Sequence, residues 1–264
     1  MARHNGFDLP WHPLQLLGWL VTAMSSFLCY FAIRPALPAA SSVAPRQTAF
    51  LALFTPLQTA VIALGFWLTY WDPTDTLVLG QREGRETATD TDALQCTDCH
   101  STVHALSKHC TRCDRCVEGF DHHCKWLNNC IGKGNYKLFW LLIVALDAAS
   151  MVQVGFGLAA LATITDDSEG IDYSEGSKEA IFALIVLDVA ISLLVSAAVS
   201  QLIGLHLWLR SKGMTTYEWI KARRLAQSKV KQGRHSFPEE GKQVLEVTLS
   251  NPQQFSVLDT DNII

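Results

Sequence analysis

The stretch that decides the fold is CTDCHSTVHALSKHCTRCDRCVEGFDHHCKWLNNC, residues 96–130, which holds seven of the eight cysteines of the 264-residue chain. Two sets of three cysteines and one histidine lie in it with identical spacing, fourteen residues apart. The sets are Cys96, Cys99, His109 and Cys116, then Cys110, Cys113, His123 and Cys130. Three thiolates and one imidazole close the tetrahedron of a structural Zn2+. The spacing predicts two interleaved zinc sites.

Outside this stretch the chain is unusually apolar. Hydrophobic residues make up 49% of it and charged residues 17%, whereas about a quarter is charged in an ordinary soluble domain. Four apolar segments are each long enough to cross about 30 Å of hydrocarbon as a helix. They run over residues 14–33, 49–71, 138–164 and 180–209. We therefore predict an all-α integral membrane protein, with a zinc-stabilised domain over residues 82–137 between the second and third helices.

The distribution of positive charge predicts the orientation. Eight Lys or Arg residues lie in the connection 72–137 and nine in the tail 210–264, against two in 34–48 and one in 165–179. Positively charged loops stay on the cytosolic side of a membrane. We expect the N-terminal residues 1–13, the zinc domain and the tail in the cytosol. Reducing cytosol favours zinc over disulfides.

One cysteine of the stretch has no place in either zinc set. Cys124 would open a third copy of the pattern, but Leu127 stands where its partner cysteine should be. In an extended segment, side chains two residues apart share a face, so His122 and Cys124 are expected to lie together, away from the zinc ligand His123. A neighbouring imidazole activates a thiol as a nucleophile. Asp121 is placed to orient that imidazole.

The sequence Asp121-His122-His123-Cys124, followed by Trp126, Asn129-Cys130, Gly132 and Asn135, resembles the DHHC family of membrane protein S-acyltransferases, or palmitoyltransferases. Thr215-Thr216-Tyr217-Glu218 matches that family's TTxE motif, in the predicted tail. Lys125 follows the DHHC cysteine, as it does in a subgroup of the family.

The resemblance implies a two-step reaction. A long-chain fatty acyl group, typically palmitoyl, passes from acyl-CoA to the cysteine matching Cys124, and then to cysteines of membrane-associated substrate proteins. The residue matching His122 is the base, and the one matching Asp121 supports it. The family's zinc ligands match the eight positions above, with two structural Zn2+. The resemblance also implies an endomembrane location, in the endoplasmic reticulum or Golgi.

Several residues are candidates for contact with acyl-CoA. Trp126 and Phe139 are candidates for the mouth of an acyl cavity, although both are also typical of interfacial anchors. Lys108, Arg112, Arg115 and Lys125 make the surroundings of Cys124 positive and are suited to CoA phosphates. The resemblance places Thr216 near the segment of Asp121.

Two further features concern the helices. Thr215 and Glu218 form a capping box that predicts a basic helix over Tyr217–Lys231, suited to an anionic leaflet or simply to solvent. Asp147 and Asp188 lie inside the third and fourth apolar segments, where ionisable groups face the bundle interior. One hypothesis is that they share a single polar network.

Other classes of protein fit the sequence less well. A catalytically idle zinc-stabilised membrane adaptor is the main alternative. A membrane ubiquitin ligase of the RING type needs a second closing CxxC, whereas Cys130 stands alone. The net charge of −4 argues against a nucleic-acid partner.

Overall fold

Membrane-length helices make up much of the chain. The computed structural model describes residues 3–37, 46–84, 92–166 and 177–231. Within those ranges, four helices are long and apolar enough to cross a membrane, over Pro13–Ile33, Arg46–Tyr70, Tyr136–Thr165 and Ser177–Ser211. The four predicted segments agree with these bounds to within three residues. The protein is therefore a multi-pass membrane protein, as predicted. The predicted tail beyond Lys231 lies outside the described residues.

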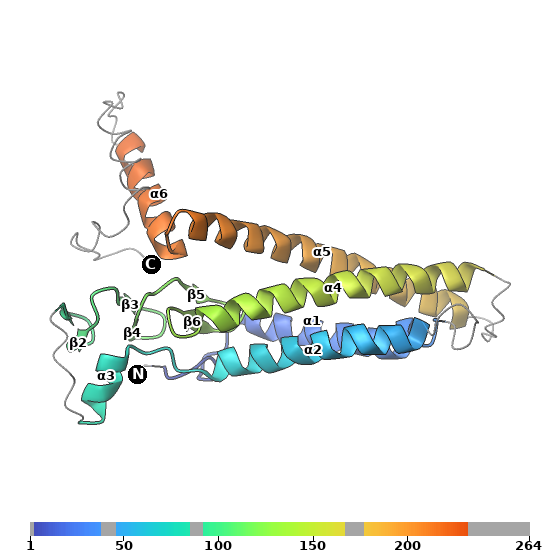
Figure 1. The fold of residues 1–264 in the computed structure, drawn as a ribbon, viewed down its shortest axis with the longest axis horizontal. Helices are drawn as coiled ribbons and strands as arrows, with labels where there is room; N and C mark the ends of the chain where they lie inside the picture. The colour runs from blue at the N-terminus through green and yellow to red at the C-terminus, as the bar shows by residue number, and fades with distance from the viewer. Residues whose placement is uncertain (1–2, 38–45, 85–91, 167–176, 232–264) are drawn as a thin grey trace. The chain divides into compact units, whose positions relative to one another are not determined.

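The chain divides into two compact units. The membrane unit comprises His12–Trp67 and Leu138–Ile203, and the zinc unit comprises Met1–Trp11, Leu68–Lys137 and Gly204–Ile264. Figure 1 shows the order of the elements along the chain. Each unit has its own packing, which the following paragraphs take in turn.

The membrane unit is built from α1 (Pro13–Leu28), α2 (Arg46–Tyr70), α4 (Tyr136–Thr165) and α5 (Ser177–Ser211). Pro13 opens α1, where a missing N–H costs nothing, and α1 continues into a π-helical turn, Cys29–Ile33. A β-carbon on Gly157 would lie 2.4 Å from Val189, so α4 and α5 approach closely there. Small residues allow such approaches in lipid, where close packing holds helices together.

Stacked aromatic rings fill the core of this unit. The rings of Phe50 and Phe54 stack with centroids 5.1 Å apart, and Phe156 meets Phe50 edge-on at 5.4 Å. Both Phe50 and Phe54 are fully buried. Edge-on and offset arrangements suit the quadrupoles of the rings, so this cluster ties α2 to α4.

The zinc unit contains three short β-hairpins that repeat every fourteen residues. The hairpin repeats are β1–β2 (Leu94–Cys96, Ser101–Val103), β3–β4 (Lys108–Cys110, Arg115–Val117) and β5–β6 (His122–Cys124, Asn129–Ile131). Their registers are equivalent, since Leu94 pairs with Val103, Lys108 with Val117 and His122 with Ile131. The sequence spacing indicated the period, but these strands were not predicted beyond one extended segment at His122–Cys124.

The turn of each hairpin has one residue in the left-handed region. These residues are His100, Asp114 and Asn128, with φ of 49°, 52° and 51°, again fourteen residues apart. Asn, Asp and His tolerate this conformation better than other non-glycine residues. The repeat is therefore conformational as well as chemical, and it fixes the same turn three times.

Among the described residues of the zinc unit, two shorter helices accompany the hairpins. α3 (Thr76–Arg82) begins at Asp75, whose carboxylate accepts a hydrogen bond from the Leu77 N–H at 2.8 Å. α6 (Thr216–Lys231) corresponds to the predicted basic helix. At its start, Glu218 accepts from the Thr215 N–H at 2.8 Å and the Thr215 hydroxyl accepts from the Glu218 N–H at 3.2 Å. This reciprocal pair confirms the predicted capping box.

Candidate zinc sites and nucleophile

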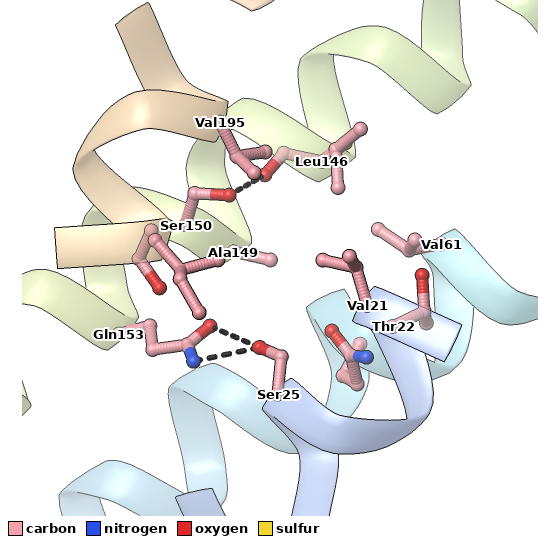
Figure 2. A pocket seen from close by; sticks show the side chains of 12 residues that line it. Val21, Thr22, Ser25, Val61, Leu146, Ala149, Ser150, Gln153 and Val195 are labelled. Carbon is pink, nitrogen blue, oxygen red and sulfur yellow. Dashed lines mark hydrogen bonds between the residues drawn. The ribbon is translucent and has the colours of Figure 1, made fainter. Parts of the chain in front are cut away.

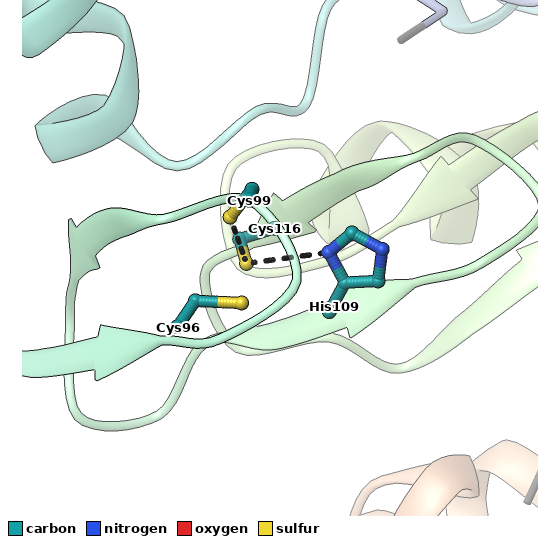
Figure 3. A group of neighbouring side chains, drawn as sticks. All are labelled: Cys96, Cys99, His109 and Cys116. Atoms are coloured by element: carbon teal, nitrogen blue, oxygen red, sulfur yellow. Dashed lines mark hydrogen bonds between the residues drawn. The ribbon is translucent and has the colours of Figure 1, made fainter. Parts of the chain in front are cut away.

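The first Cys/His cluster, a candidate zinc site, joins the first two hairpin repeats. Its four ligand-type side chains come from β1, the turn after it, β3 and β4, and Figure 3 shows them converging. The Sγ atoms of Cys99 and Cys116 are 3.2 Å apart, and Cys116 Sγ lies 3.8 Å from His109 Nδ1. The members are Cys96, Cys99, His109 and Cys116, the first predicted set.

The second Cys/His cluster, also a candidate zinc site, joins the second and third hairpin repeats and is more deeply buried. Its members are Cys110, Cys113, His123 and Cys130, the second predicted set. Cys113 Sγ lies 3.4 Å from His123 Nδ1 and 3.5 Å from Cys130 Sγ. The three cysteines are at most 1% exposed, whereas Cys96 and Cys99 of the first site are partly exposed.

The distances in both sites fit tetrahedral zinc. A tetrahedron with Zn–S bonds of about 2.3 Å has S···S edges of about 3.8 Å and slightly shorter S···N edges. The observed separations, 3.2–4.0 Å, bracket these values. In each site the histidine turns Nδ1 toward the thiols. The two clusters are consistent with two metal sites whose four protein ligands leave no open position.

The third hairpin repeat carries Cys124 outside both clusters. Cys124 lies on β5, is 8% exposed, and occupies the position that Cys96 and Cys110 have in the earlier repeats. The buried Leu127 fills the place of the second cysteine. Because no partner thiol is present at that place, the repeat supplies a cysteine that neither cluster uses.

His122 and Asp121 lie beside this thiol. His122 hydrogen-bonds Cys124, which agrees with the prediction that the two share a face of an extended segment. The Asp121 carboxylate is 2.6 Å from His122 Nδ1. Asp121 immediately precedes β5, and its N–H donates to the Ile131 carbonyl at 2.9 Å. This hydrogen bond holds Asp121 against the partner strand, and its carboxylate reaches the imidazole of the next residue.

Electrostatics favour the charged forms of this pair. Burial alone would lower the pKa of His122, but hydrogen bonds to Asp121 and Cys124 outweigh it and raise that pKa to about 9. Burial opposes ionisation of Asp121 as well, yet the hydrogen bond and charge of His122, with the Thr216 N–H, hold the pKa of the Asp121 carboxyl below its usual value. An imidazolium beside a thiol stabilises the thiolate.

Thr216 contacts Asp121 as the family resemblance implied. Its backbone N–H donates to Asp121 Oδ1 at 3.0 Å. Since Thr216 is the first residue of α6, the positive end of the helix dipole adds to this hydrogen bond. The capping box therefore positions a helix whose N-terminus steadies the carboxylate.

A buried asparagine and a buried arginine hold the third hairpin in place. This structural role was not predicted from the sequence. The Asn129 amide donates to the backbone carbonyls of Leu68 and Trp71 at 2.8 and 2.7 Å. Arg115, 1% exposed, donates to Asn129 and to the carbonyls of Arg3 and His4. Arg115 was predicted to be suited to CoA phosphates, but its guanidinium is enclosed by these acceptors. Its role is structural.

Replacing Arg115 with methionine is expected to destabilise the zinc unit by about 3–5 kcal/mol, because it leaves buried acceptors without their donor. Thermal denaturation of the zinc-loaded protein, followed by tryptophan fluorescence and zinc release, measures the loss. Arg112, which is exposed in the neighbouring turn, gives the matched control Arg112→Met. Equal denaturation midpoints for the two variants would show that the Arg115 network contributes nothing.

Asp75 is a second structural centre that was not predicted. It is 1% exposed and accepts hydrogen bonds from the His104 backbone N–H at 2.9 Å and from the Ser107 hydroxyl. His104 Nδ1 lies 3.0 Å from its other oxygen. The carboxylate thus joins the start of α3 to the loop between the first two hairpins. Sequence offered no sign of this, since 29 residues separate Asp75 from His104.

The remaining candidates for acyl-CoA contact differ in exposure. Trp126 is 53% exposed and Lys125 is exposed, whereas Lys108 is half-buried. Phe139, in α4, is 3% exposed. Burial and the nearby charge of Lys108 lower the pKa of Lys221 on α6, so two cationic side chains of the zinc unit lie close together.

The membrane unit has a cavity among its four helices (Figure 2). Aliphatic side chains such as Val21, Val61 and Leu146 line it, together with the polar Ser25 and Gln153. The Gln153 amide donates to Ser25 at 2.7 Å and to Asp188 at 2.6 Å. Half of the twelve lining residues are polar, so hydrogen-bonding groups of all four helices face this cavity beside the aliphatic ones.

The two intramembrane aspartates do not form one network through these partners. Asp188 accepts from Gln153, whereas Asp147 accepts from the hydroxyls of Ser196 and Ser200 at 2.7 and 3.1 Å. Asp147 lies on α4 and both serines lie on α5. Each carboxylate therefore links helices of the membrane unit with its own set of hydrogen bonds.

Comparison with known proteins agrees with this geometry. The sequence profile of the DHHC palmitoyltransferase family matches residues 90–223, just over half of the chain. A relative described as a probable protein S-acyltransferase 19, from Arabidopsis thaliana, is 41% identical over 140 residues. That alignment covers 50% of this chain and 20% of the relative, so the chain spans only about a fifth of the relative's length. From the profile match and the two Cys/His clusters, we conclude that the chain belongs to the DHHC palmitoyltransferase family.

Proposed function

We propose that this protein is an S-acyltransferase that moves a long-chain fatty acyl group, palmitoyl foremost, from acyl-CoA to Cys124 and then to a cysteine of a substrate protein. The observation that carries the proposal is the arrangement of Asp121, His122 and Cys124. A thiol left out of both metal clusters is hydrogen-bonded to an imidazole, which a buried carboxylate orients. This is the arrangement of an activated nucleophile and its base.

The first step forms the acyl-enzyme. The Cys124 thiol gives its proton to His122, and the thiolate attacks the carbonyl carbon of the acyl-CoA thioester. The bond from that carbon to the CoA sulfur breaks, and the CoA thiolate leaves with the proton from His122. Asp121 keeps the imidazole oriented and stabilises its cation throughout.

The second step repeats the exchange with a protein thiol. His122 takes the proton of the substrate cysteine, whose sulfur attacks the acyl carbonyl, and Cys124 leaves as the thiol. Both bonds exchanged are thioesters, so little free energy changes and the protein mainly lowers the barrier. Thiols exchange well when attacking and leaving groups have pKa values near the ambient pH.

Zn2+ in the two clusters acts as a scaffold. The four protein ligands of each site leave no position for water or substrate. The second site includes His123 of β5 and Cys130 of β6. The metal therefore fixes the hairpin that presents Cys124, and takes no part in the bond changes.

The rest of acyl-CoA is assigned to two regions. The acyl chain is assigned to the interior of the membrane unit, where each buried CH2 contributes about 0.8 kcal/mol, and Phe139 and Trp126 are candidates for contact with it. Lys108, Lys125 and Lys221 bind the CoA phosphates. The charge of Lys108 acts on Lys221 and lowers its pKa, which supports this assignment, because an anion between two ammonium groups is attracted to both.

The proposed setting is an endomembrane of the endoplasmic reticulum or Golgi, with the zinc unit in the cytosol. The excess of Lys and Arg in the central connection and the tail supports this orientation. Substrates are then membrane-associated proteins with cysteines on the cytosolic side, within reach of an enzyme held in the same bilayer.

Intact-mass analysis tests the function directly. The purified zinc-loaded protein is incubated with palmitoyl-CoA, and its mass is measured before and after hydroxylamine treatment. We expect one palmitoyl adduct per molecule that hydroxylamine removes, followed by transfer to a cysteine peptide. A protein that binds two zinc ions and unfolds cooperatively, yet gains no adduct, is instead the idle adaptor.

A further inference from the structure

A third group of metal-ligand side chains lies in the zinc unit, apart from the two Cys/His clusters. Asp121, His122 and His206 each offer a ligand atom, and these atoms all lie within 4.8 Å of one another. Asp121 and His206 are 3% and 1% exposed. The imidazole rings of His122 and His206 have centroids 5.8 Å apart. Two imidazoles and a carboxylate therefore face a common point in a buried position.

The position of His206 is itself constrained. It lies in the last turns of α5, far along the chain from His122, so no local motif connects the two. Its Nδ1 is 3.0 Å from the Tyr136 hydroxyl at the start of α4. The Arg210 guanidinium lies over the Tyr136 ring, 5.6 Å from its centroid. A hydrogen bond to one ring nitrogen orients the other toward a metal, and Tyr136 provides that hydrogen bond here.

The donor set differs in kind from the structural clusters. Two histidines and one carboxylate suit Zn2+, Co2+ and similar borderline cations, and three protein ligands leave a position open. To bind a zinc ion, the distance between Asp121 Oδ2 and His122 Nδ1 needs to increase only from 2.6 Å to about 3.3 Å, which is the O···N edge of a zinc tetrahedron.

We propose that Asp121, His122 and His206 form a third, exchangeable metal site for Zn2+, and that the ion in this site switches the enzyme off. The metal takes the place of the proton between Asp121 and Nδ1 of His122, so the carboxylate no longer stabilises the imidazolium that forms when the other ring nitrogen accepts the thiol proton. The inhibitory part rests on the proposed acyltransferase function, whereas the binding of the metal does not.

The test begins with metal binding. Protein with two structural Zn2+ is titrated with Co2+, and bound metal is counted by native mass spectrometry. We expect one further equivalent, with the visible absorption of four-coordinate cobalt. His206→Gln should abolish the further equivalent. The matched control is His100→Asn, which removes an exposed imidazole of the first hairpin turn and should bind cobalt as the wild type does.

The second measurement is the rate of acyl-enzyme formation with and without buffered free Zn2+, each variant being compared with itself. At free Zn2+ about ten times the dissociation constant, about a tenth of the wild-type rate should remain. A weak chelator that leaves two zinc ions bound should restore it. Adding the same free Zn2+ should change the rate of acyl-enzyme formation by the His206→Gln variant less than twofold.

The outcomes separate the two proposals. The proposed metal site is wrong if the His206→Gln variant still binds the further equivalent of cobalt, or if the wild type binds no further equivalent. A third metal ion that leaves the rate unchanged overturns the inhibition. A wild type without any acyl-enzyme in metal-free buffer contradicts the proposed function, while the cobalt spectrum still decides whether the site exists.

Discussion

Cys124→Ser is expected to lower formation of the acyl-enzyme by about three orders of magnitude or more, to background. A serine hydroxyl is far less acidic than a thiol, and His122 alone does not make it a comparable nucleophile. The substitution removes no ligand from either Cys/His cluster. Zinc content should therefore stay at two ions per molecule, and the midpoint of thermal denaturation should stay close to that of the wild type.

The test measures the palmitoyl adduct and the zinc content of the same sample. Intact mass after palmitoyl-CoA reports the adduct, and native mass spectrometry reports the zinc. If Cys124→Ser lost a zinc ion, Cys124 would be a ligand and the assignment of the two clusters would be wrong. If it kept both ions and still gained a hydroxylamine-labile adduct, another cysteine would be the nucleophile.

Cys113→Ala is expected to abolish the acyl-enzyme by a different route, through loss of the fold. Cys113 is 1% exposed and belongs to the site that holds β5 and β6. Binding of structural Zn2+ contributes on the order of 10–16 kcal/mol to folding, more than the whole stability of most domains. Zinc should fall from two ions to one, and the catalytic hairpin should become sensitive to protease.

A comparison between the two sites makes this prediction sharper. Cys99→Ala removes the equivalent ligand of the first site, which joins the first two hairpins. It should also lose one zinc ion and activity, but with the third hairpin still protected from protease. With intact protein, a chelator should remove one zinc ion quickly and the second slowly, because Cys96 and Cys99 are partly exposed. Simultaneous release of both ions would contradict separate sites.

The parts of the structure that the sequence predicted are those encoded by local periodicity. Membrane helices need long apolar runs because no water satisfies their backbone, so their bounds were visible in composition. Zinc requires four ligands with defined donor atoms, and a fourteen-residue spacing that supplies such a set twice rarely arises except at metal sites. The pairing of His122 with Cys124 followed from the alternation of side chains along a strand.

The missed parts depend on contacts between residues far apart in the chain. Arg3 donates to Asn128, 125 residues away, and nothing in either segment indicates the other. His206 lies in an apolar helix where a histidine has no motif to mark it. Arg115 was interpreted as a surface cation because its burial depends on carbonyl acceptors supplied by other segments. Hydrogen bonds between distant segments leave no period in the sequence, so the structure was needed to find them.

The three hairpins have a consequence for the origin of the catalyst. Each Cys/His cluster joins the CxxC of one hairpin repeat to the histidine and cysteine of the next, so a row of such repeats holds one cluster fewer than its members. In a row of three hairpin repeats, the first cysteine of the third repeat has no following repeat with which to form a cluster. Cys124 is that surplus ligand. A purely structural array that was lengthened by duplication would acquire an uncoordinated thiol in its last repeat, and that thiol is the proposed nucleophile.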